Sequence, residues 1–281
     1  MPTAATGAQG GCARLEVSQD LEYLRFEDGQ WRRTAGAVVR EDLVRLHVNG
    51  GELARLMCTP QHLDWLALGF LLSEGIIAGM ADIRLVKVCP SARCVEVWLR
   101  RADFEPPTRW TITSGCGGGV TFADLTEAAQ PLTSSLAVSA GQLSRLLRAL
   151  QATQETRGIH TSALADGESL LAVVEDVGRH NTIDKLLGRC LIESVPTRDR
   201  ILLSTGRISS EMLQKSARMG ASIVVSRTSP SSLSIELADR LHITLIGYAR
   251  RNRFNLYTHA ERIAASSPPL TVEPAVLNKA K

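Results

Sequence analysis

Residues 170–248 alternate between apolar runs of strand length and amphipathic helical stretches, and this alternation constrains the fold more than any other feature. The strand runs lie at residues 170–174, 201–204, 222–226 and 243–248. Three helical stretches lie between them. The first carries Ile183, Leu186, Leu187 and Cys190, the second is 210–219 and ends at Gly220, and the third is 231–241. Strands that alternate with helices in this way predict an α/β sandwich with a largely parallel or mixed sheet.

The first half of the chain has a different pattern, with several strands and one clear helix. Thr59 is predicted as the N-cap of this helix, with Pro60 at its first position and Gly75 at its C-terminal end. Between them, residues 63–71 carry an apolar stripe at helical spacing.

A linker is predicted at residues 131–135, and the amphipathic helix that carries Leu143, Leu146, Leu147 and Leu150 follows it. We therefore predict two units. Residues 1–135 form a smaller β-rich subdomain with one helix, and residues 136–281 form an α/β domain.

Composition excludes several classes of protein. Of the 281 residues, 44% are apolar and 22% are charged, which is typical of a globular protein rather than a disordered one. A net charge of +3, without a basic block interleaved with aromatic residues, disfavours nucleic-acid binding. The apolar stretch 63–72 contains Asp64 and is shorter than the roughly 20 residues that span a membrane. The amino end lacks the pattern of a secretory signal, so we expect a cytoplasmic protein.

The cysteines do not form a recognisable metal or redox motif. There are six, at positions 12, 58, 89, 94, 116 and 190, and no two stand in a C-x-x-C spacing. In a long chain without an export signal, reduced thiols are expected. Cys89 and Cys94 flank a short turn between the alternating runs 83–88 and 95–99, which predicts a hairpin. No metal site is predicted.

Cys116 stands among glycines at positions 115, 117, 118 and 119. A structural cysteine usually lies within an apolar periodic run, whereas flanking glycines let a large partner bring its backbone close to the sulfur. Two interpretations stay open on the segment alone: an accessible, reactive thiol, or an incidental cysteine in a glycine-rich turn.

Polar segments follow three of the predicted strands. They are 175–181 with Arg179 and His180, 204–211 with Arg207 and Ser209, and 226–232 with Arg227. Ligands of α/β folds bind where strands end and helices begin, and arginine and hydroxyl groups suit phosphate. The segments therefore predict an anionic ligand, most simply a nucleotide phosphate, although no Walker or dinucleotide-binding pattern is present. Capped helices with solvated charges are the structural alternative.

The last predicted strand ends in the densest basic cluster of the chain. Its residues are Tyr248, Ala249, Arg250, Arg251, Asn252 and Arg253. Guanidinium groups suit a pyrophosphate and asparagine suits a purine edge, so this cluster is a candidate nucleotide site. A solvated basic turn is the alternative.

Five segments, at residues 59–77, 114–117, 174–181, 206–212 and 253–258, match one known family in the right order. The chain resembles the FdhD-type formate dehydrogenase accessory sulfurtransferases nearly end to end. The resemblance implies a cytidine-deaminase-like α/β core in a cytoplasmic protein that is usually a homodimer. It also implies a sulfur carrier that accepts persulfide sulfur from a cysteine desulfurase. The sulfur is delivered to the bis(molybdopterin guanine dinucleotide) molybdenum cofactor before that cofactor enters the catalytic subunit of formate dehydrogenase.

The resemblance also assigns roles to residues. Cys116 matches the persulfide cysteine, and residues 248–253 match the cofactor-binding segment. Arg179, His180, Arg207, Ser209 and Arg227 are weaker candidates for the same pocket.

One departure from the family leaves the mechanism open. Several members have C-x-x-C in the cysteine loop, whereas this chain has Gly119 at the second position. Cys116 then hands on its sulfur directly, or a remote thiol such as Cys58, Cys89 or Cys94 assists. Alternatively, the protein is a non-catalytic chaperone that binds and delivers the cofactor.

A zinc deaminase is the rival enzyme class, because the implied core is deaminase-like and fold does not fix function. That chemistry needs an H-x-E element and a downstream P-C-x-x-C. His259 and Glu261 offer the first element, but the chain has no C-x-x-C. The sequence therefore disfavours zinc deamination.

Overall fold

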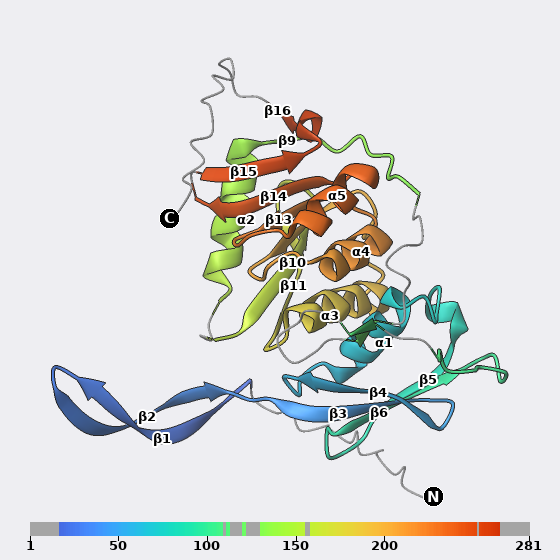
Figure 1. Cartoon of the computed structure of the whole chain (residues 1–281). Coiled ribbons are helices and arrows are strands. Elements are labelled where there is room, and N and C mark those ends of the chain that lie inside the picture. Colours follow the sequence, from blue (N-terminus) through green and yellow to red (C-terminus); the bar gives the residue numbers. More distant parts are fainter. Residues whose placement is uncertain are drawn as a thin grey trace, which may run out of the picture.

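A six-stranded mixed sheet is the centre of the computed structural model, which describes residues 17–108, 111–112, 120–121, 130–154, 158–251 and 253–264 (Figure 1). The strand order is β11-β10-β12-β13-β14-β15. Strands β12, β13 and β14 are parallel, and the other neighbouring pairs are antiparallel. Their bounds are β10 His160–Ala165, β11 Leu170–Asp176, β12 Arg200–Ser204, β13 Ala221–Ser226, β14 Thr244–Arg250 and β15 Arg253–Thr258. The predicted α/β class with a mixed sheet is confirmed.

Helices cover both faces of this sheet. They are α2 (Ala140–Ala152) on one face, and α3 (Arg179–Ile192), α4 (Ser210–Met219) and α5 (Ser232–Arg240) on the other. Because alternate strand residues point to opposite faces, Leu203 and Val225 pack in the core beneath α2, while Leu202 and Val224 pack beneath α3 to α5. The middle residues of the three parallel strands are therefore apolar on both faces of the sheet.

The helix ends follow the signals in the sequence. Ser139 and Ser231 form capping boxes at the starts of α2 and α5, and the Ser209 side chain accepts a hydrogen bond from the Met212 amide at the start of α4. Gly220 ends α4 in the left-handed conformation, with φ of 77°, as predicted.

A smaller sheet with one helix forms the other core. The strand order is β4-β3-β6-β5, and α1 packs on it. The bounds are β3 Asp42–Val48, β4 Gly51–Cys58, β5 Ile83–Val88, β6 Cys94–Leu99, α1 Leu63–Ser73 and a 3-10 turn at Met80–Asp82. Short elements complete the chain: β7 Thr111–Ile112, β8 Val120–Thr121, β9 Val138–Ser139, β16 Ile263–Ala264 and the 3-10 turn Ala260–Arg262. The predicted hairpin formed by β5 and β6 is confirmed.

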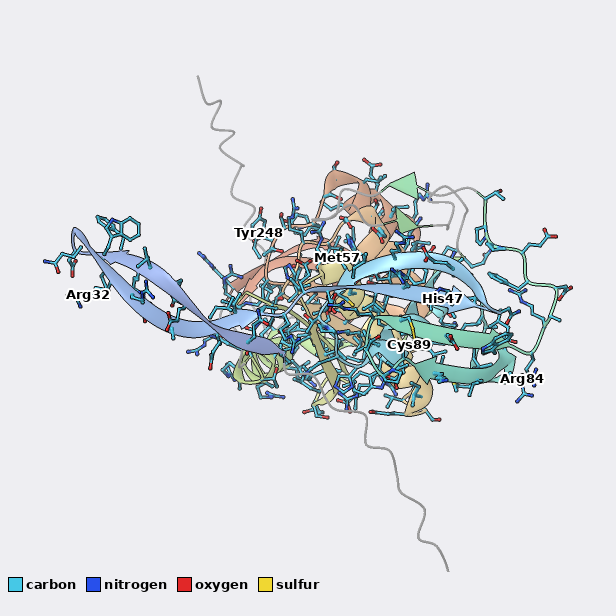
Figure 2. All side chains as sticks on the ribbon, turned by 90° about the horizontal axis from the view of Figure 1, so that it is seen from below. Arg32, His47, Met57, Arg84, Cys89 and Tyr248 are labelled. Atoms are coloured by element: carbon cyan, nitrogen blue, oxygen red, sulfur yellow. A yellow bond between two sulfur atoms is a disulfide. The ribbon has the colours of Figure 1, made fainter. Side chains whose placement is uncertain are left out.

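A two-stranded arm extends away from both cores (Figures 1 and 2). It consists of β1 (Ser18–Glu27) and β2 (Gln30–Val39), paired antiparallel along their whole length. Its outer half carries Leu24, Phe26 and Trp31 on one face, each at least 60% exposed. The sequence did not predict an arm, because its apolar residues resemble those of a core strand.

The two cores are joined by an unusually close crossing of α1 and α3. At Gly69 a Cβ atom would lie 1.7 Å from the carbonyl oxygen of Asp184, and at Gly188 it would lie 1.9 Å from that of Trp65. Both positions must therefore be glycine for the two helix backbones to touch. The crossing sets the orientation of the smaller core against the larger one.

Thr59 corrects one local prediction. It is not the N-cap of α1, because the cap is His62, which has φ of 49°. Thr59 instead links the cores: its amide donates to Asp176 Oδ2 at 3.2 Å, and its hydroxyl accepts from the Val177 amide at 3.1 Å. The cytidine-deaminase-like description and the boundary between residues 135 and 136 stay predictions. Within the described residues, no helix is both long enough and apolar enough to cross a membrane.

Candidate functional site

One edge of the central sheet collects the segments that the sequence singled out. Strands β11, β12, β13 and β14 all end at this edge, which follows from their pairing with β10 and with one another. The segments after β11, β12 and β13 carry Arg179, Arg207 and Arg227, and β14 itself ends at Arg250. Ligands of α/β proteins bind at such an edge.

A pocket of about 400 Å³ lies at this edge, beside α2. It is lined by Leu147, Gln151, Arg227, Ala249, Arg250, Arg251 and Arg253. Four of the residues predicted from the 248–253 cluster therefore share one cavity with Arg227, one of the weaker candidates. The structure supports their convergence; binding of a ligand stays a prediction.

The pocket arginines are oriented by neutral groups. Arg227 donates from Nη1 to Gln154 Oε1 at 2.9 Å, and Arg250 donates from Nη1 to the carbonyl oxygens of Arg227 and of Ala249. Within the described ranges, none of Arg227, Arg250, Arg251 and Arg253 has an ion-pair partner. Four positive charges without a carboxylate in a concave site can hold a di-anionic or more highly charged ligand.

The backbone at the end of β14 is shaped by a bulge. The pairing of β14 with β15 shifts between Gly247 and Arg250, and Tyr248 adopts φ of 51°. A Cβ atom at Gly247 would lie 2.7 Å from Pro230 Cδ. Bulges and left-handed residues of this kind re-aim side chains near functional sites. Tyr248 is half exposed and does not line the pocket, while Asn252 lies outside the described residues.

The other weaker candidates form a separate, buried group. His180 Nε2 lies 3.3 Å from Ser209 Oγ and 3.2 Å from Glu211 Oε2. Arg179 is 5% exposed, and Gly206 packs so closely that a Cβ there would lie 2.8 Å from Arg179 Cβ. Arg207 is exposed and joins neither group. None of these residues lines the arginine pocket.

Burial lowers the pKa of His180 to about 3, and the positive charges of Lys215 and Arg179 act in the same direction. His180 Nε2 faces Glu211 Oε2, an oxygen that has no hydrogen-bond partner within the described residues. The other oxygen of Glu211 faces Lys215 Nζ at 3.8 Å, so this carboxylate is shared between a histidine and a lysine.

We predict that His180→Gln weakens the acid sensitivity of folding. The native ring stays neutral down to about pH 3, whereas in an unfolded chain it takes up a proton near its ordinary value of 6.5. Its contribution to stability is therefore complete above pH 6.5 and falls as the pH drops below it, by about 1.4 kcal/mol per pH unit. Between pH 7.5 and pH 5.5, the free energy of unfolding, measured with urea, should fall by about 1 kcal/mol less in the variant than in the wild type. Equal losses in the two proteins would contradict the buried neutral state.

Asp176 is a buried junction between the cores. Its carboxylate lies 2.7 Å from Lys185 Nζ and accepts hydrogen bonds from the Gly178 amide and from Asn181 Nδ2. Asp176 belongs to the polar segment 175–181, whose charges the structural alternative places in solvent. It is instead fully buried, and its partner Lys185 is only 1% exposed.

Most hydroxyls of the strand-end segments have structural partners. Ser226 Oγ donates to the Gly206 carbonyl at 2.6 Å, Ser204 Oγ accepts from the Gly206 amide, and Thr205 Oγ1 accepts from the Thr161 amide. Ser209 caps α4. The arginines rather than the hydroxyls of these segments are therefore the groups available to an anion.

The cysteines differ sharply in environment. Burial raises the pKa of Cys58 to about 12 and that of Cys190 to about 11. Cys89 and Cys94 are joined by a disulfide, so the expectation of reduced thiols was wrong for this pair. Cys116 and Gly119 lie outside the described residues.

Sequence reasoning missed the contribution of α2 and of Glu211. Gln151 on α2 lines the pocket, and Gln154, which follows the end of α2, holds Arg227, but a glutamine at either place carries no signal of which strand edge it faces. Glu211 lies in the first turn of α4, where an acidic residue is ordinarily explained by the helix dipole. His259 and Glu261, the deaminase-like element, contact each other at 3.1 Å, and His259 also contacts the Asp239 carbonyl.

The fold and the edge pocket define a mixed α/β protein with an arginine-lined pocket at one edge of its central sheet. Comparison with known proteins gives the family. The model of the FdhD/NarQ family matches residues 39–264. The sulfur carrier protein FdhD of Bacillus subtilis is 38% identical over 257 residues, covering 88% of this chain and 98% of its own. That of Staphylococcus haemolyticus is 36% identical over 260 residues, covering 89% and 98%.

A solved structure agrees with this assignment. A crystal structure from Desulfotalea psychrophila, described as a formate dehydrogenase accessory protein, matches with a TM-score of 0.76 at 28% identity and covers 89% of this chain and 100% of its own. The chain belongs to the FdhD/NarQ family.

Proposed function

We propose that this protein is a sulfur carrier that serves formate dehydrogenase. In this proposal Cys116 takes sulfur from a cysteine desulfurase as a persulfide. The protein then supplies that sulfur to the bis(molybdopterin guanine dinucleotide) cofactor, which is its cargo, before the cofactor enters the enzyme's catalytic subunit. The relatives named sulfur carriers and the formate dehydrogenase accessory neighbour support this role.

The observation that carries the proposal is the pocket with four arginines that have no ion-pair partner among the residues that the structure describes. The cargo ends in a guanine nucleotide joined through a pyrophosphate, and guanidinium groups bind such phosphates in bidentate fashion. Arg251 and Arg253 are exposed and line the cavity, while Arg227 is held in place by Gln154. The residues present therefore fit the pyrophosphate.

Sulfur capture by Cys116 would follow thiol–persulfide exchange. The thiolate attacks the outer sulfur of the desulfurase persulfide, and the desulfurase cysteine leaves as the thiol. Cys58 and Cys190 are poor substitutes, because burial raises the pKa of both thiols well above neutral pH. We further propose that the protein is cytoplasmic and forms a homodimer. Light scattering after gel filtration would test the dimer.

Cys116→Ala tests the carrier role. After incubation with a cysteine desulfurase and cysteine, the intact mass of the wild type should rise by one sulfur, and a reductant should remove the gain. The variant should show no gain and should fail to support maturation of formate dehydrogenase. If the variant supports maturation as well as the wild type does, the protein is instead a chaperone that binds and delivers the cofactor.

Replacement of two pocket arginines tests the cargo site. Because a charge-assisted hydrogen bond contributes about 1.5–3 kcal/mol, Arg251→Ala with Arg253→Ala should weaken guanosine diphosphate binding at least tenfold. Titration calorimetry measures the affinity. The matched control removes the same charge with Arg84→Ala and Lys87→Ala, both exposed on β5; Figure 2 labels Arg84. Equal weakening by both pairs would mean that net charge, not the pocket, attracts the nucleotide.

A further inference from the structure

We propose that Cys89 and Cys94 are a redox-active pair that releases sulfur from a persulfide as sulfide, supplying two electrons and ending as the disulfide seen in the structure. This inference rests on the proposed sulfur-carrier function. It answers a chemical requirement of that function, because a persulfide carries sulfur that must gain two electrons to leave as sulfide.

Accessibility distinguishes this pair from the other described cysteines. Cys58 and Cys190 are buried. Cys89 and Cys94 are each only partly buried, and most of the turn between them is exposed. Because exchange requires a sulfur that an incoming thiolate or persulfide can reach, the pair is suited to it.

The pair lies at the end of the small sheet that adjoins the strand-end edge. Strand β3 lies between β6 and β4, and its Arg45 lies opposite Cys94 of β6. Its Asp42, three residues before Arg45, lies opposite Cys58 at the end of β4. The next residue, Thr59, bonds to Asp176 and Val177 at the end of β11. The hairpin tip is thus connected through one strand end to the edge that carries the arginine pocket.

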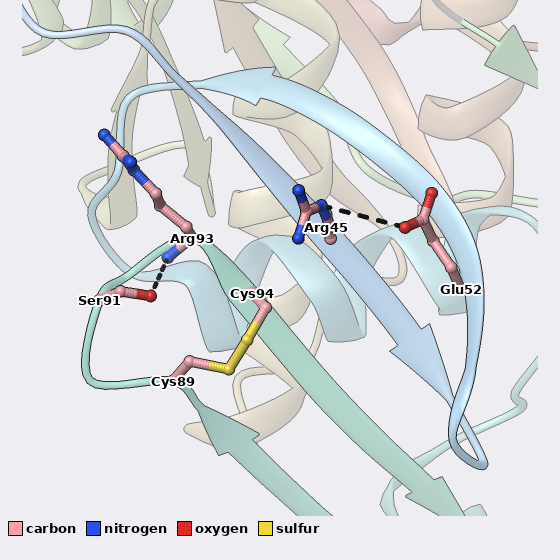
Figure 3. The surroundings of a disulfide bond; sticks show 6 residues. All are labelled: Arg45, Glu52, Cys89, Ser91, Arg93 and Cys94. Atoms are coloured by element: carbon pink, nitrogen blue, oxygen red, sulfur yellow. Dashed lines mark hydrogen bonds and ion pairs between the residues drawn. A yellow bond between two sulfur atoms is a disulfide. The ribbon is translucent and has the colours of Figure 1, made fainter.

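A purely structural role explains this disulfide poorly. It closes a turn of four residues between Cys89 and Cys94 (Figure 3). The turn is already held by the bond from the Cys89 amide to the Cys94 carbonyl and by that from the Ala92 amide to the Cys89 carbonyl, both 2.9 Å. The stabilisation from a cross-link grows with the loop it closes, so it is small here. Disulfides in cytoplasmic proteins are usually transient and catalytic or redox-sensing.

Two ion pairs lie near this hairpin tip. Arg93 is exposed within the turn, where its Nε lies 3.3 Å from Asp42 Oδ2, and Arg45 lies across from Cys94 on the neighbouring strand (Figure 3). Arg45 Nε also lies 4.0 Å from Glu52 Oε2, so both guanidinium groups face a carboxylate, and the thiolate form of the reduced pair is the one that attacks.

The chemistry balances in two displacements. One thiolate of the reduced pair attacks the outer sulfur of a persulfide R–S–SH, so that R–SH leaves and the pair carries the persulfide. The second cysteine then attacks the inner sulfur of that new persulfide, forms the Cys89–Cys94 bond and expels HS⁻. In sum, a persulfide and a dithiol give a thiol, hydrogen sulfide and a disulfide. A dithiol reductant, such as dithiothreitol or a protein of thioredoxin type, restores the pair.

The test uses the full chain with Cys116→Ala, so that the pair is assayed without the proposed carrier. The protein is reduced with dithiothreitol, freed of reductant without oxygen and mixed with one equivalent of glutathione persulfide. Sulfide trapped with monobromobimane should reach about one per chain above a protein-free control, and peptide mapping should find the 89–94 disulfide. Cys94→Ser should release no extra sulfide and should retain one sulfur on Cys89. Ser91→Ala, in the same turn, should behave like its parent.

Two results would overturn the inference. One is undiminished sulfide release when Cys89→Ser and Cys94→Ser are combined, and the other is a disulfide that dithiothreitol leaves intact in the folded protein. Far-ultraviolet circular dichroism verifies folding, and alkylation of the reduced pair tests the same step without a substitution. Failure of the carrier role has a separate signature: Cys116→Ala would then load as much sulfur from the desulfurase as the wild type.

Discussion

Gly69→Ala is expected to destabilise the protein by roughly 3 kcal/mol or more, because the added methyl group meets backbone rather than a movable side chain. The new Cβ would lie 1.7 Å from the Asp184 carbonyl oxygen and 2.7 Å from the Gly188 amide nitrogen. Helices α1 and α3 must therefore separate, and the Thr59 contacts between the cores separate with them. Gly188→Ala should have a similar effect, since its Cβ would lie 1.9 Å from the Trp65 carbonyl oxygen.

A third helical glycine provides the matched control for this prediction. Gly141 lies in α2, and a Cβ there would meet only Ser139 Oγ, at 3.8 Å. Gly141→Ala should therefore be neutral or stabilise by about 0.5–1 kcal/mol, as alanine does in a helix. Thermal or urea unfolding of the three variants measures the difference. If Gly69→Ala unfolds at the same temperature as Gly141→Ala, the helices do not cross at backbone contact.

These glycines show where sequence reasoning reaches its limit on the fold. Apolar periodicity predicted four strands of the central sheet to within a few residues, because that signal is local, but it did not predict β10 or β15. A glycine inside a helical pattern signals a close packing partner. It does not identify that partner, and Gly69 and Gly188 are more than a hundred residues apart.

The same distinction holds at the candidate site. The convergence of Arg227 with Arg250, Arg251 and Arg253 could be predicted in outline, because the carboxyl ends of parallel strands meet at one edge. The separation of His180 from these arginines could not be predicted. Its place depends on burial against Glu211 and Lys215, and a charged residue in a helix is ordinarily expected to face solvent.

Lys215 illustrates this most clearly and carries the second large expected effect. Its ammonium lies 2.6 Å from Asp184 Oδ2 and 3.8 Å from the carboxylates of Glu74 and of Glu211, and it is 4% exposed. Burial lowers the pKa of Lys215, but Asp184, Glu211 and Glu74 outweigh burial and hold that pKa above its ordinary value. Lys215→Met removes the cation that faces three buried carboxylates. Unfolding should become easier by about 3–5 kcal/mol at neutral pH.

The direction of the pH dependence separates lost charge pairing from lost packing. Burial already raises the pKa of Asp184, and without Lys215 that pKa rises further. A group whose pKa is raised by folding stabilises the folded state below its unfolded value and loses that contribution as the pH rises. The deficit of Lys215→Met, measured by urea unfolding, should therefore be smaller at pH 5 than at pH 8.

Asp184→Asn in the same chain should restore part of the stability lost in Lys215→Met, because asparagine removes one charge and can still accept the hydrogen bond from Ser73 Oγ. The exposed Lys87→Met on β5 is the matched control and should change stability by less than about 0.5 kcal/mol. A deficit that is constant with pH and unrelieved by Asp184→Asn would mean that Lys215 acts through its packed methylene chain. Helices α1, α3 and α4 meet at this lysine, beneath the strand-end edge. If lost charge pairing accounts for the deficit, the stability of that edge depends on this one buried ion cluster.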